Sequence, residues 1–425
     1  MNYQYGVQSK KGGKKMSISL YYKSYANSDS FAEKILQRNI PMNIIEQILR
    51  YPIGQRCYRL FLLHENETPK QDITPYVLNN GTLEKTYQQG QTRSLSINLL
   101  NPQEIWNPSP IRGRLFANSK FKLQMGIQID KYIYWIDEGV FVCKDPELNN
   151  TDANKSVSIE LFDKFALLDG TISGTTEVDY EIPVGTNLYK ALRSLLRLPK
   201  DNLGNPYDSQ NIVFPMKYMN EKVPYTIKKT ANNNIGEIII DLANCLSCDV
   251  FYDEIGRLTF RDNLDEIDFH NRNIAWHFKE ENSEFGKVSR RDEWSKIKNR
   301  YIVKGCNING MQFKGIADNN NPASAYNING NFGIHPEIIE DNLIYSNNLC
   351  LQRAQYELKK NFRKNTTVSF ECRYLPHIAP NDLVRWSFED YNYVNQLFIV
   401  NSVSIPLTPK EQMSLSISNI NELPL

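Results

Sequence analysis

The sequence has almost no net charge, and it lacks any long hydrophobic run. Its 425 residues include 49 Lys and Arg against 48 Asp and Glu, which leaves a formal net charge of +1. Proteins that wrap duplex nucleic acid concentrate positive charge against the phosphates, so this balance argues against that class. No segment approaches the roughly eighteen consecutive apolar residues of a transmembrane helix. The sequence therefore predicts no membrane span.

Cysteine is scarce and scattered. The seven cysteines are Cys57, Cys143, Cys245, Cys248, Cys306, Cys350 and Cys372. No apolar segment follows the early lysines, so we expect no secretory signal and interpret the cysteines as reduced, buried thiols. Only Cys245 and Cys248 have motif spacing. They lack a second pair or a nearby histidine to complete a zinc site, so we expect core residues, with a redox pair as the alternative.

Catalytic motifs are also missing. The five histidines, His64, His270, His277, His335 and His377, are isolated from one another. No HExxH, GxSxG or P-loop sequence occurs, and no GxGxxG precedes a predicted helix. The sequence therefore predicts no catalytic residue, no cofactor site and no metal site, and we expect the protein not to be an enzyme.

Three residue groups come nearest to a site, and each has a simpler interpretation. The densest carboxylates are Asp262, Asp265, Glu266 and Asp268. Paired carboxylates can perform acid–base catalysis, but polar neighbours here favour a solvated acidic edge. Two oxygen-rich clusters, one with Asp201, Asn205 and Asp208 and one over 318–321, lack the ligand spacing of a calcium loop.

The third group alternates basic and apolar residues. Its members are Trp294, Lys296, Ile297, Lys298, Arg300 and Tyr301, after Arg290 and Arg291. Aromatic residues between basic ones can bind single-stranded nucleic acid. On a strand, however, the three basic residues share one face and the other face packs inward, which is our preferred interpretation. So long a chain without concentrated chemistry suggests a scaffold.

The first fifty residues form a separate segment in our interpretation. Codons for Lys11, Gly12, Gly13 and Lys14 could spell a purine-rich ribosome-binding site shortly before Met16. We therefore expect Met16 to be the natural start and residues 1–15 to be a translated leader, which N-terminal sequencing would test. Apolar residues spaced through 28–50 indicate an arm or helix that docks on a neighbouring subunit.

Hydrophobic periodicity divides the rest into three domains. Over 51–170, apolar and polar residues alternate, as in Leu95, Ile97 and Leu99, which predicts a first antiparallel β-barrel or sandwich domain. Over 171–280, the period changes and predicts a small α+β domain. Over 281–425, strands return with one helix near 347–360 and an Asn- and Gly-rich insertion over 307–333. The predicted fold class is mainly β, with two tube-like barrels and an α+β middle region.

The middle region has the clearest local signals. Thr186 can cap a helix whose apolar stripe includes Leu188, Leu192 and Leu195, and Pro199 ends it. A second helix is predicted over 235–247. It leads into a hairpin whose strands cover 249–252 and 257–260.

Several segments together resemble one family. They are Leu161-Phe162-Asp163-Lys164-Phe165-Ala166-Leu167-Leu168-Asp169-Gly170, Ile182-Pro183-Val184-Gly185-Thr186, the helix and hairpin over 241–260, and the segments 298–305, 354–358 and 379–384. In this order and spacing, the chain resembles the tail-hub, or baseplate hub, proteins of long-tailed bacteriophages and of related contractile particles. The resemblance covers residues 51–420.

The resemblance implies a structural role in a virion. Such hubs are homotrimers in which six barrels form a ring, and the ring adapts a sixfold tail tube to a threefold tip. The implied partners are tail-tube or distal-tail ring proteins, the tape-measure protein and a tip or spike protein. DNA would meet the ring only in transit through its lumen during genome ejection. The implied location is the tail tip or baseplate, after tail assembly from protein made in the host cytoplasm.

Three alternatives remain open at this point. A tail-associated cell-wall hydrolase shares the hub region and adds a lytic domain, which we expect to be absent because the chain ends at Leu425, just beyond the last predicted strand. A distal-tail adaptor would be rich in β-structure but would lack the helix and hairpin. The third alternative is a polysaccharide-acting enzyme that uses Asp262 and Glu266. Zymography and oligomer mass distinguish these alternatives from a hub.

Overall fold

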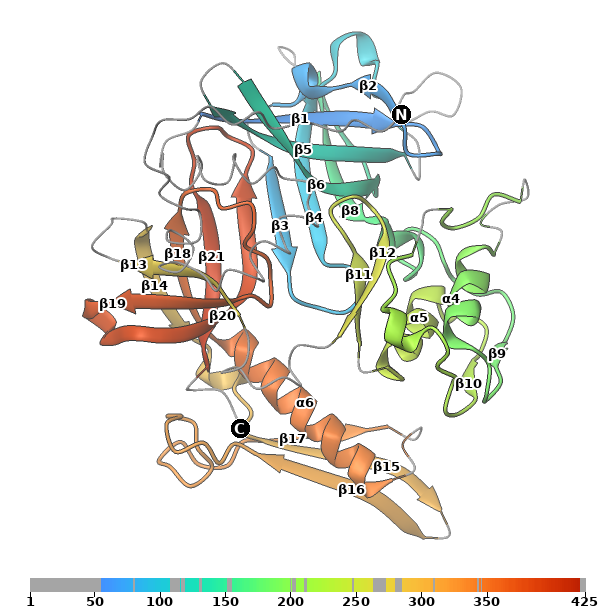
Figure 1. Ribbon diagram of the computed structural model, residues 1–425, viewed down its shortest axis with the longest axis vertical. Helices are drawn as coiled ribbons and strands as arrows, with labels where there is room; N and C mark the ends of the chain where they lie inside the picture. Colours follow the sequence, from blue (N-terminus) through green and yellow to red (C-terminus); the bar gives the residue numbers. More distant parts are fainter. Residues whose placement is uncertain are drawn as a thin grey trace, which may run out of the picture.

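The fold is mainly β, and most of its strand pairs are antiparallel (Figure 1). The structure is a computed structural model. It describes residues 55–420 except for 79–80, 108–114, 116–118, 130–131, 151–154, 199, 201–203, 210–211, 247, 263–272, 280–284, 309, 342–343 and 345. The predicted fold class is confirmed. The predicted leader and arm over 1–50, including Met16, lie outside the described residues.

The first strand group comes from the N-terminal part of the chain. It comprises β1 (Gln55–Leu63), β2 (Pro69–Asp72), β3 (Thr82–Thr86), β4 (Arg93–Leu100), β5 (Lys120–Ile129), β6 (Tyr132–Cys143), β7 (Glu147–Asn150) and β8 (Lys155–Asp163). The strands follow the order β3-β4-β8-β6-β5-β1-β2, and β7 pairs with β8. The predicted alternation is real: Leu95, Ile97 and Leu99 are buried, because every second side chain of a strand points to the same face.

The second strand group comes mostly from the C-terminal part of the chain. It comprises β13 (Ile274–Lys279), β14 (Phe285–Asp292), β18 (Thr366–Cys372), β19 (Leu383–Phe388), β20 (Tyr393–Pro406) and β21 (Met413–Asn419). Only the β13–β19 pair of this group is parallel. The residues of β13 precede the boundary predicted at 281, yet this strand pairs with β19.

Strand β20 joins the two groups into one sheet. It has 14 residues; its first part pairs with β19, and its last part, Ser402 to Pro406, pairs with β3. One hydrophobic cluster accordingly contains buried residues of both groups, such as Leu95 and Trp386. The division of the chain into separately folding domains stays a prediction.

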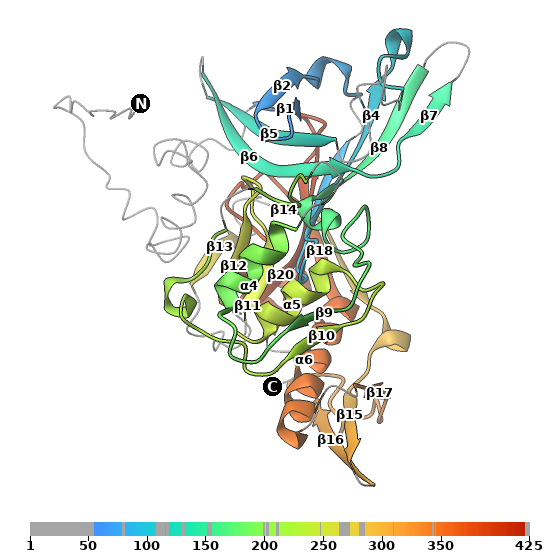
Figure 2. The same ribbon diagram turned by 90° about the vertical axis from the view of Figure 1, so that its right-hand side faces the viewer.

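The middle unit lies beside this sheet and has its own core (Figure 2). We use this name for β9 (Tyr180–Ile182), α4 (Leu188–Leu196), β10 (Ile227–Lys229), α5 (Ile235–Asn244), β11 (Cys248–Tyr252) and β12 (Leu258–Asp262). Strands β11 and β12 form an antiparallel hairpin, as predicted.

Two details of the middle unit differ from the prediction. The side chain that caps α4 is Asn187, whose oxygen accepts the backbone N–H of Lys190 at 3.0 Å. The Thr186 hydroxyl instead donates to the Pro183 carbonyl at 2.7 Å, so it is not available as the cap. Helix α5 ends at Asn244 rather than at 247.

The arm unit lies at the end of the molecule opposite β1, β2 and β5 (Figure 1). It consists of α6 (Asn347–Asn365) and the arm sheet, which contains β15 (Arg300–Ile308), β16 (Met311–Asp318) and β17 (Pro336–Glu340) in the order β16-β15-β17. The first part of the predicted insertion over 307–333 thus contains the end of β15 and all of β16, in which residues alternate between a face that packs on α6 and an exposed face. The helix predicted near 347–360 is α6, and its Cys350, Ala354 and Leu358 are buried against this sheet.

Candidate functional site: a buried charged joint

The sequence-derived site candidates do not assemble into a catalytic centre in the described part of the chain. Asp262 ends β12, whereas Asp265, Glu266, Asp268 and His270 lie outside the described residues. The other histidines lie on different elements. For example, His377 contacts the ring of Trp276 with a centroid distance of 5.4 Å.

The oxygen-rich clusters are used for internal contacts. Arg300 binds both carboxylate oxygens of Asp318, at 2.6 and 2.7 Å. Asn319 and Asn321 are buried and hydrogen-bonded within their own loop. Asp201 lies outside the described residues, and Asp208 belongs to the joint described below. Among the described side chains, no three His, Cys, Asp or Glu residues are grouped so that they could hold a metal ion.

The basic and apolar segment near residue 297 also differs from the prediction. Residues Trp294–Lys296 form a 3-10 turn, and the strand begins only at Arg300. Lys296 pairs with Glu293 at 2.8 Å, and Lys298 lies 3.9 Å from Glu337. The basic residues therefore do not form one strand face, and their charges are matched within the chain.

The most concentrated buried charge surrounds Lys164. This residue follows β8 in the short helix η3 (Lys164–Leu167), and its side chain is fully buried. Its ammonium group lies 2.7 Å from Glu67 Oε1 and 2.9 Å from Asp208 Oδ2, and it donates to the Gly256 carbonyl at 2.8 Å. It also lies 4.9 Å from the ring centre of Tyr252. One lysine thus connects the first strand group to two parts of the middle unit.

The partners of Lys164 are connected to each other and to further residues. The Tyr252 hydroxyl donates to Asp208 Oδ2 at 2.9 Å, and Lys120 pairs with Glu67 at 2.8 Å. Burial, followed by the nearby Asp208 carboxylate, raises the pKa of Tyr252 well above its ordinary value, so this hydroxyl stays a donor. Every charge near Lys164 therefore has an opposite charge or a hydrogen-bond donor beside it.

Asp163, the residue before Lys164, fixes the backbone of the joint. Its carboxylate accepts the backbone N–H groups of Phe165 at 3.0 Å, Thr92 at 2.7 Å and Arg93 at 3.0 Å. Burial raises the pKa of Asp163 to about 6, although the Thr92 N–H and the Arg93 charge oppose the shift. This carboxylate holds the start of η3 and the start of β4 together.

The loop between β3 and β4 attaches to the hairpin of the middle unit. Gly90 donates its backbone N–H to the Val250 carbonyl at 2.8 Å, and the Gln89 side chain accepts the Val250 N–H at 2.9 Å. Arg93 pairs with Glu254 at 2.9 Å and donates to the Tyr252 carbonyl. The loop thus lies along β11 like an additional strand.

A second buried pair lies within the first strand group and is joined by a tyrosine that follows β18 of the second group. Glu138 is the extra residue of a bulge in β6, because Leu123 faces Gly139 while Gln124 faces Asp137. The bulge directs its carboxylate inward, where it binds Lys85 of β3 and accepts the hydroxyl of Tyr374. Lys85 is 2% exposed and Glu138 is 0% exposed. This contact also joins distant segments of the chain.

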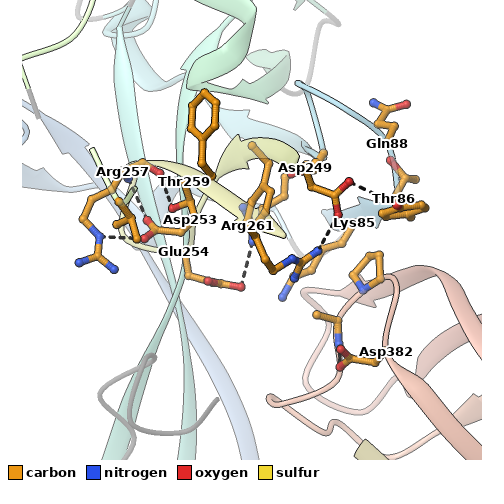
Figure 3. A pocket seen from close by; sticks show the side chains of 18 residues that line it. Lys85, Thr86, Gln88, Asp249, Asp253, Glu254, Arg257, Thr259, Arg261 and Asp382 are labelled. Carbon is orange, nitrogen blue, oxygen red and sulfur yellow. Dashed lines mark hydrogen bonds and ion pairs between the residues drawn. The ribbon is translucent and has the colours of Figure 1, made fainter. Parts of the chain in front are cut away.

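A cavity of about 290 Å³ lies where the first strand group, the second strand group and the middle unit meet (Figure 3). Its lining includes Lys85 of β3, Asp249 and Arg261 of the hairpin, and Asp382 of the second strand group. Asp249 and Arg261 lie 3.5 Å apart, and Asp382 accepts the Ala379 backbone N–H at 2.9 Å. These charged groups already bind other residues of the same chain. The arrangement therefore suits holding the units together better than it suits acid–base chemistry.

Sequence reasoning did not find this joint as a site. Its charged residues are far apart in the sequence, and no local spacing marks them, so only the folded chain brings them together. The one signal was indirect: Asp163 and Lys164 lie in a segment that carries the family resemblance.

None of the helices in the described part of the chain combines the length and apolar character that a membrane crossing requires.

Comparisons with known proteins show the fold. No protein-family model and no curated protein matches the sequence. A 43 kDa tail protein of prophage MuSo2 from Shewanella oneidensis matches 87% of this chain and 99% of its own, with a TM-score of 0.56 at 11% identity. A tail protein from Neisseria meningitidis matches 88% of this chain and 98% of its own, with a TM-score of 0.55 at 10% identity.

These similarities extend over almost the whole length of both tail proteins. At identities of 10 and 11% they establish a shared fold rather than shared activity. The fold implied by the resemblance to tail-hub proteins is therefore confirmed.

Proposed function

We propose that the chain is a structural subunit of a phage tail tip or baseplate hub. In this proposal three copies form a ring that adapts a sixfold tail tube to a threefold tip and surrounds the DNA channel. The observation that carries the proposal is the shared fold with a prophage tail protein and with the tail protein from Neisseria meningitidis, over 87 and 88% of this chain.

The internal architecture supports a connector. Each chain has two strand groups joined through β20, so three copies would present six such groups around an axis. Lys164 pairs with Asp208 of the middle unit, and Glu138 accepts the hydroxyl of Tyr374 from the second strand group, so buried charges fix the units to each other. A connector has to keep a fixed geometry while its neighbours pull on it, and internal charge pairs of this kind favour one arrangement.

The nearly neutral net charge suits a channel wall. A strongly basic ring would hold DNA phosphates by releasing their counterions, whereas a balanced surface lets DNA pass. We propose a location in the virion, with tail-tube or distal-tail ring proteins, the tape-measure protein and a tip or spike protein as partners. We propose no catalytic role.

Oligomer mass and electron microscopy test the proposal. We expect purified protein, alone or with a tail partner, to form rings with a central hole and three times the 49.3 kDa chain mass. A sixfold ring would instead favour a distal-tail adaptor. Clearing of cell walls in a zymogram would favour a tail-associated hydrolase or a polysaccharide-acting enzyme. A protein that stays monomeric with every tail partner would contradict the hub.

A further inference from the structure

The arm sheet has one covered face and one open face. Helix α6 packs on the face that contains Tyr301, Val303 and Ala317. On the opposite face, the register aligns Ile316 of β16, Ile302 of β15 and Ile338 of β17 in one row. Ile316 is 42% exposed and Ile338 is 53% exposed, so this apolar row reaches both edges of the sheet.

Both outer strands have backbone groups that point away from the sheet. Asp341, just after β17, donates its N–H to Lys304 of β15 at 2.8 Å. Because successive residues of a strand point their backbone groups to opposite sides, those of Ile338 and Glu340 point outward. On β16, Lys314 donates its N–H to the Asn347 side chain at 2.8 Å rather than to β15, so the backbone groups of Lys314 and Ile316 also point outward.

The two edges carry opposite charge. The β17 edge presents Glu337 and Glu340. Glu340 is 66% exposed on the open face, where one of its carboxylate oxygens pairs with Lys304 of β15 at 3.0 Å. The β16 edge presents Lys314, which is exposed on the same face and has no ion-pair partner among the described residues. Asp318, the acidic residue of β16, is already bound by Arg300.

We propose that β17 of one copy of this chain pairs antiparallel with β16 of the next copy, with Ile338 opposite Ile316. In this register Glu340 lies opposite Lys314, the isoleucine row continues across the joint, and the outward backbone groups of Ile338 and Ile316 face each other. The Lys314 N–H keeps its bond to Asn347, so the contact at that position is between side chains. A two-residue shift in either direction loses both side-chain matches. Pairing β17 with β17 would bring two acidic edges together, which is unfavourable.

This pairing joins two different surfaces, so it continues from copy to copy rather than ending in a twofold dimer, and it closes into a ring when the rotation between copies is that of a threefold axis. It rests on the proposed ring and adds one of its joints. A five-residue strand is too short to hold the ring alone, so it would act together with contacts between the strand groups.

Cross-linking between two tagged forms of the full chain tests the joint. Chains carrying Ile316→Cys and chains carrying Ile338→Cys are co-expressed with different tags, purified through both tags and treated with a short bifunctional thiol reagent. We expect covalent dimers in the mixed assembly, at least tenfold more than with either variant alone. The wild-type chain, treated with the same reagent, controls for cross-links through the native cysteines. Glu337→Cys, paired with Ile316→Cys, controls for the register, because Glu337 lies on the face covered by α6.

The outcomes separate this joint from the proposed function. Dimers in the mixed assembly, with few in the single variants and in the Glu337→Cys control, support the pairing. Rings that form without cross-links, or cross-links in Ile316→Cys or Ile338→Cys alone, overturn the pairing while the ring proposal stands. Protein that forms no oligomer under any condition, including with tail partners, overturns both.

Discussion

The middle unit and the arm unit attach to the rest of the chain in different ways. The middle unit is held by buried charges: Lys164, Asp208 and Glu67 have side chains that are 0, 2 and 8% exposed. The arm unit is attached through an apolar cluster in which Phe362 of α6 packs with Leu383 and Ile399 of the second strand group. The outer face of its sheet keeps Ile316 and Ile338 exposed. Charges used inside the chain fix geometry, whereas exposed apolar residues at an open edge are available to another chain.

Removing the buried lysine is the strongest test of the first half of this comparison. Lys164→Met removes the ammonium group that pairs with the buried carboxylates of Asp208 and Glu67. We expect the free energy of unfolding to fall by about 3–5 kcal/mol, as when one partner of a buried ion pair is removed. Denaturant unfolding measures the change. The matched control is Lys155→Met, whose pair with Glu104 is about half exposed and which should change little. Equal effects of the two variants would refute a special role for the joint.

A substitution that introduces a steric clash between α6 and the arm sheet tests the part of the comparison that concerns the arm unit. A Cβ atom added at Gly315 would lie 2.1 Å from the backbone nitrogen of Leu351, so Gly315→Val pushes the helix off the arm sheet. We expect a loss of about 1–3 kcal/mol, as for overpacked cores. Hydrogen exchange should rise in α6 and the arm sheet while the middle unit stays protected. Gly286→Ala, where an added Cβ meets nothing within 4 Å, is the control. Faster exchange throughout the molecule would show that the arm is not a separate unit.

A charged residue in the isoleucine row separates folding from assembly. Because Ile338 is 53% exposed, Ile338→Lys should leave the unfolding free energy within about 0.5 kcal/mol of the wild type. It should weaken ring formation by about tenfold, which corresponds to roughly 1.4 kcal/mol. Mass photometry over a concentration series gives both the oligomer mass and its midpoint. Met216→Lys, at an 84% exposed site of the middle unit, should have no effect on assembly. Equal weakening by both variants would contradict the account of the arm.

The smallest expected effect is a pH dependence of the joint. Burial raises the pKa of Asp163 to about 6, above its ordinary value of 3.8. The folded protein therefore takes up this proton at a higher pH than the unfolded chain does, so the contribution of Asp163 to stability increases as pH falls from 7 towards 4. Between pH 7 and pH 5 we expect the wild type to gain about 1 kcal/mol relative to Asp163→Asn, which does not titrate.

Thermal unfolding of the two proteins at both pH values measures this difference.

The stability contribution of His277 should change with pH in the opposite direction, because burial and the neighbouring Lys279 and Arg385 lower the pKa of His277 to about 4. Its contribution to stability is lost as pH falls from 6.5 towards 4, so His277→Asn should lose less stability on acidification than the wild type. A constant difference between wild type and Asp163→Asn at both pH values would contradict the account of Asp163.

Local patterns predicted local structure well. The alternation around Leu95 and the apolar stripe over Leu188 and Leu195 correspond to strand β4 and helix α4, because each pattern follows from the period of one element. Details of the ends were harder: Asn187 and Thr186 are both good caps, and only the folded geometry decides between them.

Long-range contacts could not be predicted in the same way. Lys164 meets Glu67 and Asp208, and Glu138 points inward only because a bulge in β6 turns it. The edge match between β16 and β17 depends on the strand register, which the sequence does not state. The resemblance to tail hubs gave the overall fold, whereas the joints within it required coordinates.

The central claim is that this chain acts as a geometric connector built from copies of itself, and particle mass with symmetry from electron microscopy tests it most directly. The account predicts hollow rings with threefold symmetry and three times the 49.3 kDa chain mass. A protein that stays a single chain with all its tail partners present, and that degrades a cell-wall polysaccharide, would contradict it.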